Sequence, residues 1–252
     1  MQLFTRILFE QILNTKEFLS EKLTKINRVY ALKIPILMYH HIDSASNSAG
    51  HNKLYTTKYL FNKEMEYLSQ NKFVSITLDD LANALLNKKA LPKKTIIITI
   101  DDGFEDIYTN AFPLLNYYKI KTTIFIITNT LDRKGVLSVP MIKEMINSRL
   151  ISIGSHTINH KNLTKLDTER LKYELKESKN YLEKIFHVSV NSLAYPFGSY
   201  DKRVIKETIV SGYKNAVTTK YGKLHYQNKL YLFPRIRHGD KLELSDFIRR
   251  IH

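Results

Sequence analysis

From residue 34 onward, short apolar runs rich in β-branched residues alternate with longer runs that have helical periodicity. Continuous apolar strands are typical of a parallel sheet with both faces covered, and their alternation with helices favours such a sheet. Because the alternation repeats so often, closure of the sheet into an α/β barrel is expected. The predicted strands are residues 34–42, 73–78, 95–100, 122–127, 151–155, 192–197, 215–218 and 231–237. The predicted helices include residues 57–70, 104–118 and 168–186.

Two polar motifs follow predicted strands. Two adjacent carboxylates, Asp101 and Asp102, follow the third strand, and two histidines, His156 and His160, follow the fifth. The histidines lie one turn apart on one face if that segment is helical. Two imidazoles and a carboxylate can hold a divalent metal ion, and a second carboxylate can take a proton from the water that the ion holds. Singly, such motifs are often a polar turn or surface histidines, but together at the C-terminal ends of barrel strands they indicate a metal-assisted hydrolase.

Four segments resemble one family. Residues 99–103, Thr-Ile-Asp-Asp-Gly, resemble the Thr-Phe/Tyr-Asp-Asp-Gly signature of the polysaccharide deacetylases, which are carbohydrate esterase family four or the NodB-homology domain. Residues 156–160 match the family's His-Ser/Thr-x-x-His motif, and residues 194–198 resemble its Pro-aromatic turn. Residues 34–42 resemble the opening strand of the poly-N-acetylglucosamine deacetylase-like branch. The resemblance implies a distorted (β/α) barrel of about seven strands.

The resemblance also implies roles for the site residues. Asp101 is expected to be the general base, while Asp102, His156 and His160 bind one divalent metal ion. Zn²⁺ is the favoured ion, and Co²⁺, Ni²⁺ and Fe²⁺ suit the same ligands. The ion polarises the acetamide carbonyl, and the backbone N–H of Phe197 is expected to stabilise the oxyanion. The expected reaction is hydrolysis of the N-acetyl group of an N-acetylated sugar, in a polysaccharide or a lipid-linked glycan.

The chain departs from the family pattern in the arginine that orients the base. Many members carry this arginine shortly before the proline of the third motif, where residues 192–195 are Ser-Leu-Ala-Tyr. A guanidinium must then come from elsewhere, and the run 233–237 offers Arg235 and Arg237. Arg235 is the expected partner of Asp101, because the glucosamine-polymer branch has a similar Pro-Arg-Ile run. The alternative is that both arginines are surface charges.

A second departure concerns the acid that protonates the leaving amine. Family members commonly use a histidine in a Leu-x-His motif near the C-terminus, and His238 is expected to take this role, with Asp240 orienting its imidazole. In a regular strand, Arg235 and His238 point to opposite faces. Both can therefore enter one pocket only through a bulge or turn. His40, near the end of the first predicted strand, is the alternative acid.

The net positive charge of the chain suggests an alternative function. Lys plus Arg number 39 against 24 for Asp plus Glu, so the net charge is +15, which favours anionic partners such as a membrane surface. A basic protein that binds anionic polymers is one alternative, but the sequence has no nucleic-acid motif and no nucleic acid is expected as a partner. An O-acetyl or xylan esterase on the same scaffold is another, since the same water attack cleaves esters. Cysteine is absent, so disulfides and cysteine-based zinc sites are excluded.

The chain is expected to have two parts. Residues 1–30 are predicted to form a helical extension, with an amphipathic helix over residues 2–27, and residues 31–252 the deacetylase domain, with its core motifs from residue 95 onward. No secretory signal peptide or membrane-spanning run is evident, so a location in the cytoplasm or at the cytoplasmic face of the membrane is expected. The polar loop 44–53 is placed to cover a substrate groove. The oligomeric state is left open.

Overall fold

The computed structural model describes residues 29–43, 54–239 and 242–252. The chain divides into two units, Met1–Tyr30 and Ala31–His252, and the second is described below. The amphipathic helix predicted over residues 2–27, the loop 44–53 and Asp240 lie outside the described residues. The assignment of residues 1–30 and 31–252 to an extension and a catalytic domain stays a prediction. No helix in the described ranges is long and apolar enough to cross a membrane.

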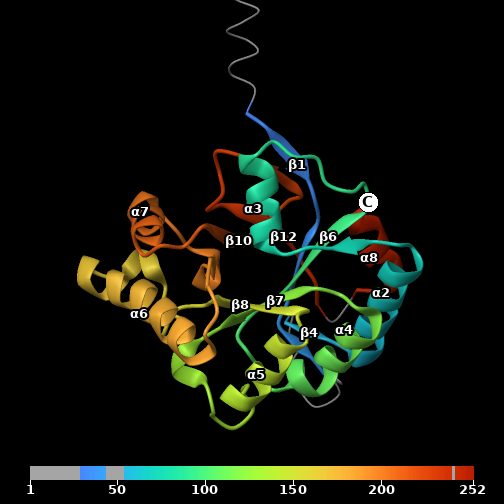
Figure 1. Cartoon of the computed structure of the whole chain (residues 1–252), viewed down its shortest axis with the longest axis horizontal. Helices are drawn as coiled ribbons and strands as arrows, with labels where there is room; N and C mark the ends of the chain where they lie inside the picture. Colours follow the sequence, from blue (N-terminus) through green and yellow to red (C-terminus); the bar gives the residue numbers. More distant parts are fainter. Residues whose placement is uncertain (1–28, 44–53, 240–241) are drawn as a thin grey trace, which may run out of the picture. The chain divides into compact units, whose positions relative to one another are not determined.

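Seven parallel strands form a closed barrel, as predicted (Figure 1). Their order around the ring is β2-β12-β10-β9-β8-β7-β6, and β6 pairs with β2 to close it. The closing register runs from Ile36 opposite Ile97 to Tyr39 opposite Ile100. The strands are β2 (Ile36–Tyr39), β6 (Thr95–Ile100), β7 (Thr122–Ile126), β8 (Ile151–Ser155), β9 (Ser192–Ala194), β10 (Asn215–Tyr221) and β12 (Phe233–Arg237). Every residue of β2, β6 and β7 is buried, as expected for strands covered on both faces.

Short strands extend the barrel at its margins. The strand β5 (Val74–Ser75) pairs with the start of β6 in parallel. The strands β1 (Ala31–Lys33) and β11 (Leu224–Tyr226) form an antiparallel pair, and β3 (His41–Ile42) and β4 (Tyr55–Thr56) a parallel one.

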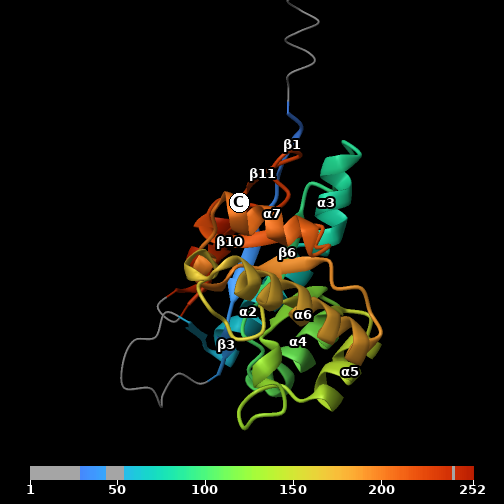
Figure 2. The ribbon, with the colours of Figure 1, turned by 90° about the vertical axis from the view of Figure 1, so that its left-hand side faces the viewer.

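Helices cover the outside of the barrel, and α4, α5 and α6 follow one another around the strands β6 to β8 (Figure 1, Figure 2). Most begin at a side chain that accepts a hydrogen bond from the first turn, such as Thr57 at α2 and Asp167 at α6. The α-helices are α2 (Lys58–Gln70), α3 (Leu78–Leu86), α4 (Phe112–Tyr118), α5 (Val139–Asn147), α6 (Thr168–Phe186), α7 (Lys202–Val210) and α8 (Leu244–Ile251). The π-helix η2 (Ile107–Ala111) precedes α4, and the 3₁₀-helices are η3 (Thr128–Thr130), η4 (Leu163–Lys165) and η5 (Pro196–Gly198).

Several predicted strands are shorter than expected, and local sequence features explain two of them. The run 73–78 forms only β5, because Thr77 and Asp80 make a reciprocal capping box that starts α3 at Leu78. The run 192–197 ends at Ala194, because Pro196 cannot donate a ladder hydrogen bond and begins a 3₁₀ turn. The turn lies just past the C-terminal end of β9, where it borders the site described next.

Candidate active site

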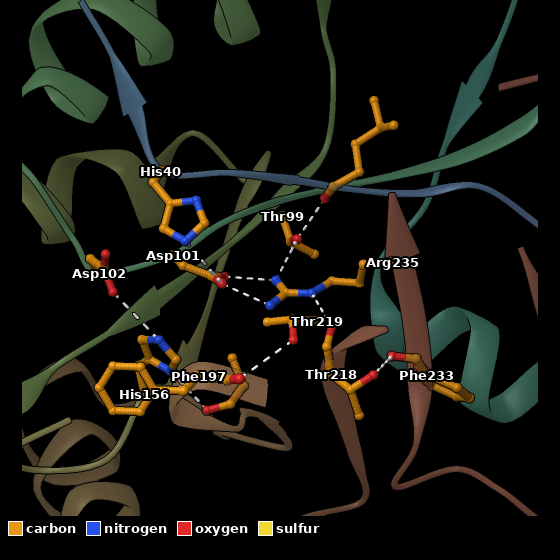
Figure 3. A network of polar contacts seen from close by, with 12 residues as sticks. His40, Thr99, Asp101, Asp102, His156, Phe197, Thr218, Thr219, Phe233 and Arg235 are labelled. Atoms are coloured by element: carbon orange, nitrogen blue, oxygen red, sulfur yellow. Dashed lines mark hydrogen bonds and ion pairs between the residues drawn. The ribbon is translucent and has the colours of Figure 1, made fainter. Parts of the chain in front are cut away.

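Most of the polar groups predicted for the site gather at the C-terminal ends of the barrel strands (Figure 3). His40 follows β2, Asp101 and Asp102 follow β6, and His156 follows β8. The parallel register sets these ends side by side, because Tyr39 is opposite Ile100 across β2 and β6. The barrel therefore brings together residues that are more than a hundred positions apart in the chain.

The turn after β6 separates the two adjacent carboxylates. Asp102 and Gly103 both have left-handed backbone conformations, with φ of +73° and +78°, and the Gly103 N–H donates to the Asp101 carbonyl. A Cβ on Gly103 would lie 3.3 Å from the Ile126 side chain, so the turn favours glycine for space as well as conformation. Asp101 faces Arg235, and Asp102 faces His156 (Figure 3).

The two histidines of the second motif lie on a loop, so the condition under which they would share one helical face is not met. Residues 156–160 contain no helix, and Thr157 and His160 have left-handed φ values of +68° and +53°. The bend nevertheless brings both imidazoles to one carboxylate. The Nε2 atoms of His156 and His160 lie 3.4 and 3.8 Å from Asp102 Oδ1. One ligand atom from each of the three residues falls within 4.8 Å of the others.

This cluster fits a divalent metal ion. His156 Nδ1 donates to the Ala194 carbonyl at 2.7 Å, which leaves the Nε2 lone pair of the neutral ring directed at Asp102. Asp102 Oδ1 is buried and has no hydrogen-bond donor within the described part of the chain. A cation between these two electron-rich atoms, either a proton on His156 or a metal ion, removes their repulsion, and an Asp/His/His donor set suits Zn²⁺ and similar ions.

The electrostatics of the cluster agree with that need. Burial opposes a charge on His156, but the contact with Asp102 and the charges of Asp101 and Asp102 outweigh it and raise the His156 pKa. Burial likewise opposes ionisation of Asp102, yet contact with His156 lowers the pKa of that carboxyl. Positive charge is therefore stabilised at His156, whereas burial lowers the pKa of His160.

Arg235 lies inside the barrel and binds Asp101 with both arms of its guanidinium. Nη1 and Nη2 donate to the two carboxylate oxygens of Asp101 at 2.7 Å each, and Nε donates to the Thr218 carbonyl. Nη1 also donates to Thr99 Oγ1 at 3.0 Å. Burial disfavours the Asp101 carboxylate, but the Arg235 charge and hydrogen bonds outweigh burial and hold the pKa of Asp101 far below its ordinary value. Asp101 is therefore ionised at neutral pH.

The structure brings His40 to the site and places His238 elsewhere. His40 is buried with its Nε2 3.9 Å from Asp101 Oδ2, and burial is the main cause of a lowered pKa for its imidazole. His238 instead lies with its Nε2 2.5 Å from Glu64 Oε1, between the rings of Tyr39 and Phe247. Arg235 takes the inward position on β12, so His238 is turned to the outside, against α2 and α8. The prediction that His238 enters the pocket of Asp101 as the acid is therefore wrong, because His238 lies against Glu64.

Sequence reasoning missed the buried partner of His238. Glu64 is fully buried on α2, where its Oε2 accepts the hydroxyl of Tyr39 at 2.8 Å. The available signal was a carboxylate within an apolar helical stripe, since Phe61 and Leu68 flank Glu64 at helical spacing.

The Pro-aromatic turn borders the histidine cluster. Phe197 has a left-handed φ of +60° and is 62% exposed, and the centroid of its ring lies 4.6 Å from that of the His160 ring. Glycine is required at 198, because a Cβ there would lie 2.0 Å from Thr219 Oγ1. The N–H groups of Gly198 and Ser199 donate within the turn, and Pro196 has none. Within this turn, the Phe197 N–H is therefore the backbone donor that takes no part in the turn's internal hydrogen bonds.

Known proteins are similar to this chain in sequence and in fold. A family model described as polysaccharide deacetylase matches residues 88–216. YxkH of Bacillus subtilis (strain 168), assigned to the polysaccharide deacetylases, is 34% identical over 215 residues, which cover 85% of this chain and 75% of YxkH. The poly-β-1,6-N-acetyl-D-glucosamine N-deacetylase of Staphylococcus aureus (strain MRSA252) is 28% identical over 71% of this chain and 66% of that enzyme. The Streptococcus pyogenes deacetylase PplD, solved in complex with acetate, is 28% identical, with a TM-score of 0.82, over 88% of this chain and 99% of that structure.

Proposed function

Because this chain belongs to the polysaccharide deacetylase family, we propose that it hydrolyses the N-acetyl group of an N-acetylated sugar with the help of one divalent metal ion. The observation that carries the proposal is the Asp102, His156 and His160 cluster, with the second carboxylate of Asp101 beside it. A relative that acts on poly-β-1,6-N-acetyl-D-glucosamine supports an N-acetylglucosamine polymer as the substrate class.

Asp102, His156 and His160 hold the ion, for which Zn²⁺ is the favoured choice. When bound, the ion supplies a Lewis acid for the acetyl carbonyl and lowers the pKa of water toward neutrality. The chain's own part is to fix the ligand atoms. His156 is oriented by its Nδ1 bond to Ala194, and Asp102 by its left-handed turn.

Asp101 acts as the general base that takes the proton from the attacking water. Arg235 keeps it ionised and fixes its orientation, because the bidentate pair leaves the carboxylate little freedom to rotate. The Phe197 N–H donates to the oxyanion that develops on the acetyl oxygen. Its left-handed turn is the local structure that directs this N–H away from the turn's own hydrogen bonds.

His40 replaces His238 as the acid that protonates the leaving nitrogen. Its Nε2 lies near Asp101 Oδ2, so the proton taken from water can pass between two groups of the same pocket. Burial lowers the pKa of the His40 imidazole, which makes its protonated form a stronger acid. His238 has no such path, because its Nε2 is occupied by Glu64.

A panel of acetylated saccharides tests the proposal. Acetate release is measured on N-acetylglucosamine oligomers, on a lipid-linked N-acetylated sugar and on O-acetylated xylan. We expect release from an N-acetylated substrate, and the length or lipid that supports the highest kcat/KM identifies the glycan. Release from O-acetylated substrates alone supports the esterase alternative and contradicts the proposal. Association of the chain, which carries a net charge of +15, with an anionic membrane surface stays a prediction.

A further inference from the structure

Glu174 is a buried carboxylate that the proposed chemistry does not use. It lies on the inner face of α6 with 5% of its surface exposed. Its Oε2 accepts the backbone N–H groups of Ile158 and Asn159 at 2.9 Å each, and its Oε1 accepts the side-chain amide of Asn159 at 2.8 Å. No cationic side chain pairs with it in the described ranges. Three N–H donors from one loop therefore provide the stabilisation that this buried charge requires.

The loop that supplies these donors carries both metal-site histidines. Ile158 and Asn159 stand between His156 and His160 in the sequence. The loop also contains strained backbone, because Thr157 is β-branched and has a φ of +68°, a conformation that such residues rarely adopt. A strained conformation persists only where surrounding contacts hold it, and the carboxylate of Glu174 makes three of those contacts.

A second anchor comes from the same helix, one turn later. The Ser178 and Ser155 hydroxyls lie 2.8 Å apart, and Ser155 Oγ accepts the backbone N–H of Thr157 at 3.1 Å. Thr157 Oγ1 in turn accepts the N–H of His160 at 3.1 Å. The helix α6 thus holds the loop on both sides of its bend, with Ser178 at one end and the carboxylate four residues earlier at the other.

We propose that Glu174 is a positioning residue that forms the histidine loop before the metal ion binds. The inference rests on the metal site of the proposed function and adds a residue that touches neither the ion nor the substrate. A neutral amide at this position carries no charge and offers one acceptor oxygen in place of two, so its N–H₂ group would face at least one of the three N–H donors and the loop would be held less firmly. Part of the free energy of metal binding would then be used to order the two imidazoles, so the affinity for the metal ion would fall.

Glu174→Gln tests the inference, with Glu177→Gln as the matched control on the exposed face of the same helix. The Zn²⁺ dissociation constant is measured by competition with a chromophoric chelator, and thermal unfolding is followed for the metal-free proteins. We expect Glu174→Gln to weaken Zn²⁺ binding by about 10- to 100-fold, the range for outer partners of metal ligands. Glu177→Gln is expected to stay within about twofold of the original protein. Unchanged Zn²⁺ affinity in Glu174→Gln, whatever its melting temperature, would overturn the proposal.

Hydrogen exchange of the unaltered, metal-free protein gives a test that does not depend on a variant folding. A preformed loop predicts that the amide protons of Ile158 and Asn159 are protected before Zn²⁺ is added. Fast exchange that slows only after Zn²⁺ is added would refute the idea. Both measurements are independent of deacetylation, so a chain that binds Zn²⁺ but releases no acetate would contradict the proposed function and leave this inference standing.

Discussion

Replacement of Arg235 by methionine removes the cation that compensates the buried carboxylate of Asp101. Arg235 and Asp101 are 1% and 2% exposed and share two hydrogen bonds of 2.7 Å. Removal of one partner of such a pair leaves an uncompensated buried charge, which costs about 3–5 kcal/mol. We therefore expect Arg235→Met to lose about that much free energy of unfolding at pH 7.

The loss should shrink in acid, and its sign follows from the pKa of Asp101. In the original protein Arg235 lowers this pKa, so the stabilisation from Asp101 is present above the ordinary pKa of about 4 and is lost only as the pH falls through the lower folded value. In Arg235→Met the guanidinium that lowers the pKa of Asp101 is gone, so burial raises this pKa. The carboxyl then takes up a proton as the pH falls toward 5, and the penalty disappears.

Urea unfolding of the metal-loaded proteins at pH 7 and pH 5 measures both effects. Arg237→Met is the control, because Arg237 is an exposed side chain on the same strand, and its cost should stay within about 0.5 kcal/mol. The reasoning is refuted if Arg235→Met loses less than about 1 kcal/mol at pH 7, or if its difference from the original protein grows on acidification. Either result would show that Arg235 does not compensate Asp101.

Three further predictions concern the proton transfers and the buried pair. Asp101→Asn should keep its metal, by elemental analysis, and lose at least about 10²-fold in kcat; near-normal acetate release would assign the base elsewhere. His40→Ala should impair amide hydrolysis far more than hydrolysis of an activated aryl ester, whereas His238→Ala should not discriminate between them. The opposite pattern would restore His238 as the acid. Glu64→Gln should lose about 3 kcal/mol in urea unfolding, since it leaves His238 without its carboxylate, while Zn²⁺ affinity is retained; unchanged stability would deny the pair a structural role.

The sequence predicts the parts of this fold that repeat a clear pattern. The strands β6 and β8 and the helix α6 have the bounds expected from their periodicity, because each is a continuous run between strong capping or turn residues. The carboxylates and histidines at the strand ends could likewise be placed, since parallel strands end at one edge. Periodicity does not predict contacts set by tertiary packing; the contact between Arg235 and Asp101 was expected from the family resemblance, and the structure contains it.

The features that the sequence did not reveal have local physical causes. Histidine spacing at 156 and 160 suits a helix, but the buried carboxylate of Glu174 binds the intervening N–H groups and stabilises a bend instead. The assignment of His238 failed because only one face of β12 points into the barrel, and Arg235 occupies it. Both missed residues, Glu64 and Glu174, are carboxylates on an apolar helix face, but the groups that donate hydrogen bonds to them come from other segments of the chain.

Titration of the metal-free protein with Zn²⁺ tests the central claim most directly. Chelated protein is supplied with increasing Zn²⁺, and bound metal and acetate release from an N-acetylglucosamine oligomer are measured on the same samples, beside Asp102→Ala. We predict that both quantities rise together and saturate at one Zn²⁺ per chain, and that Asp102→Ala retains no stoichiometric metal and releases no acetate. Full acetate release by the chelated protein, or full metal occupancy in Asp102→Ala, would contradict the account.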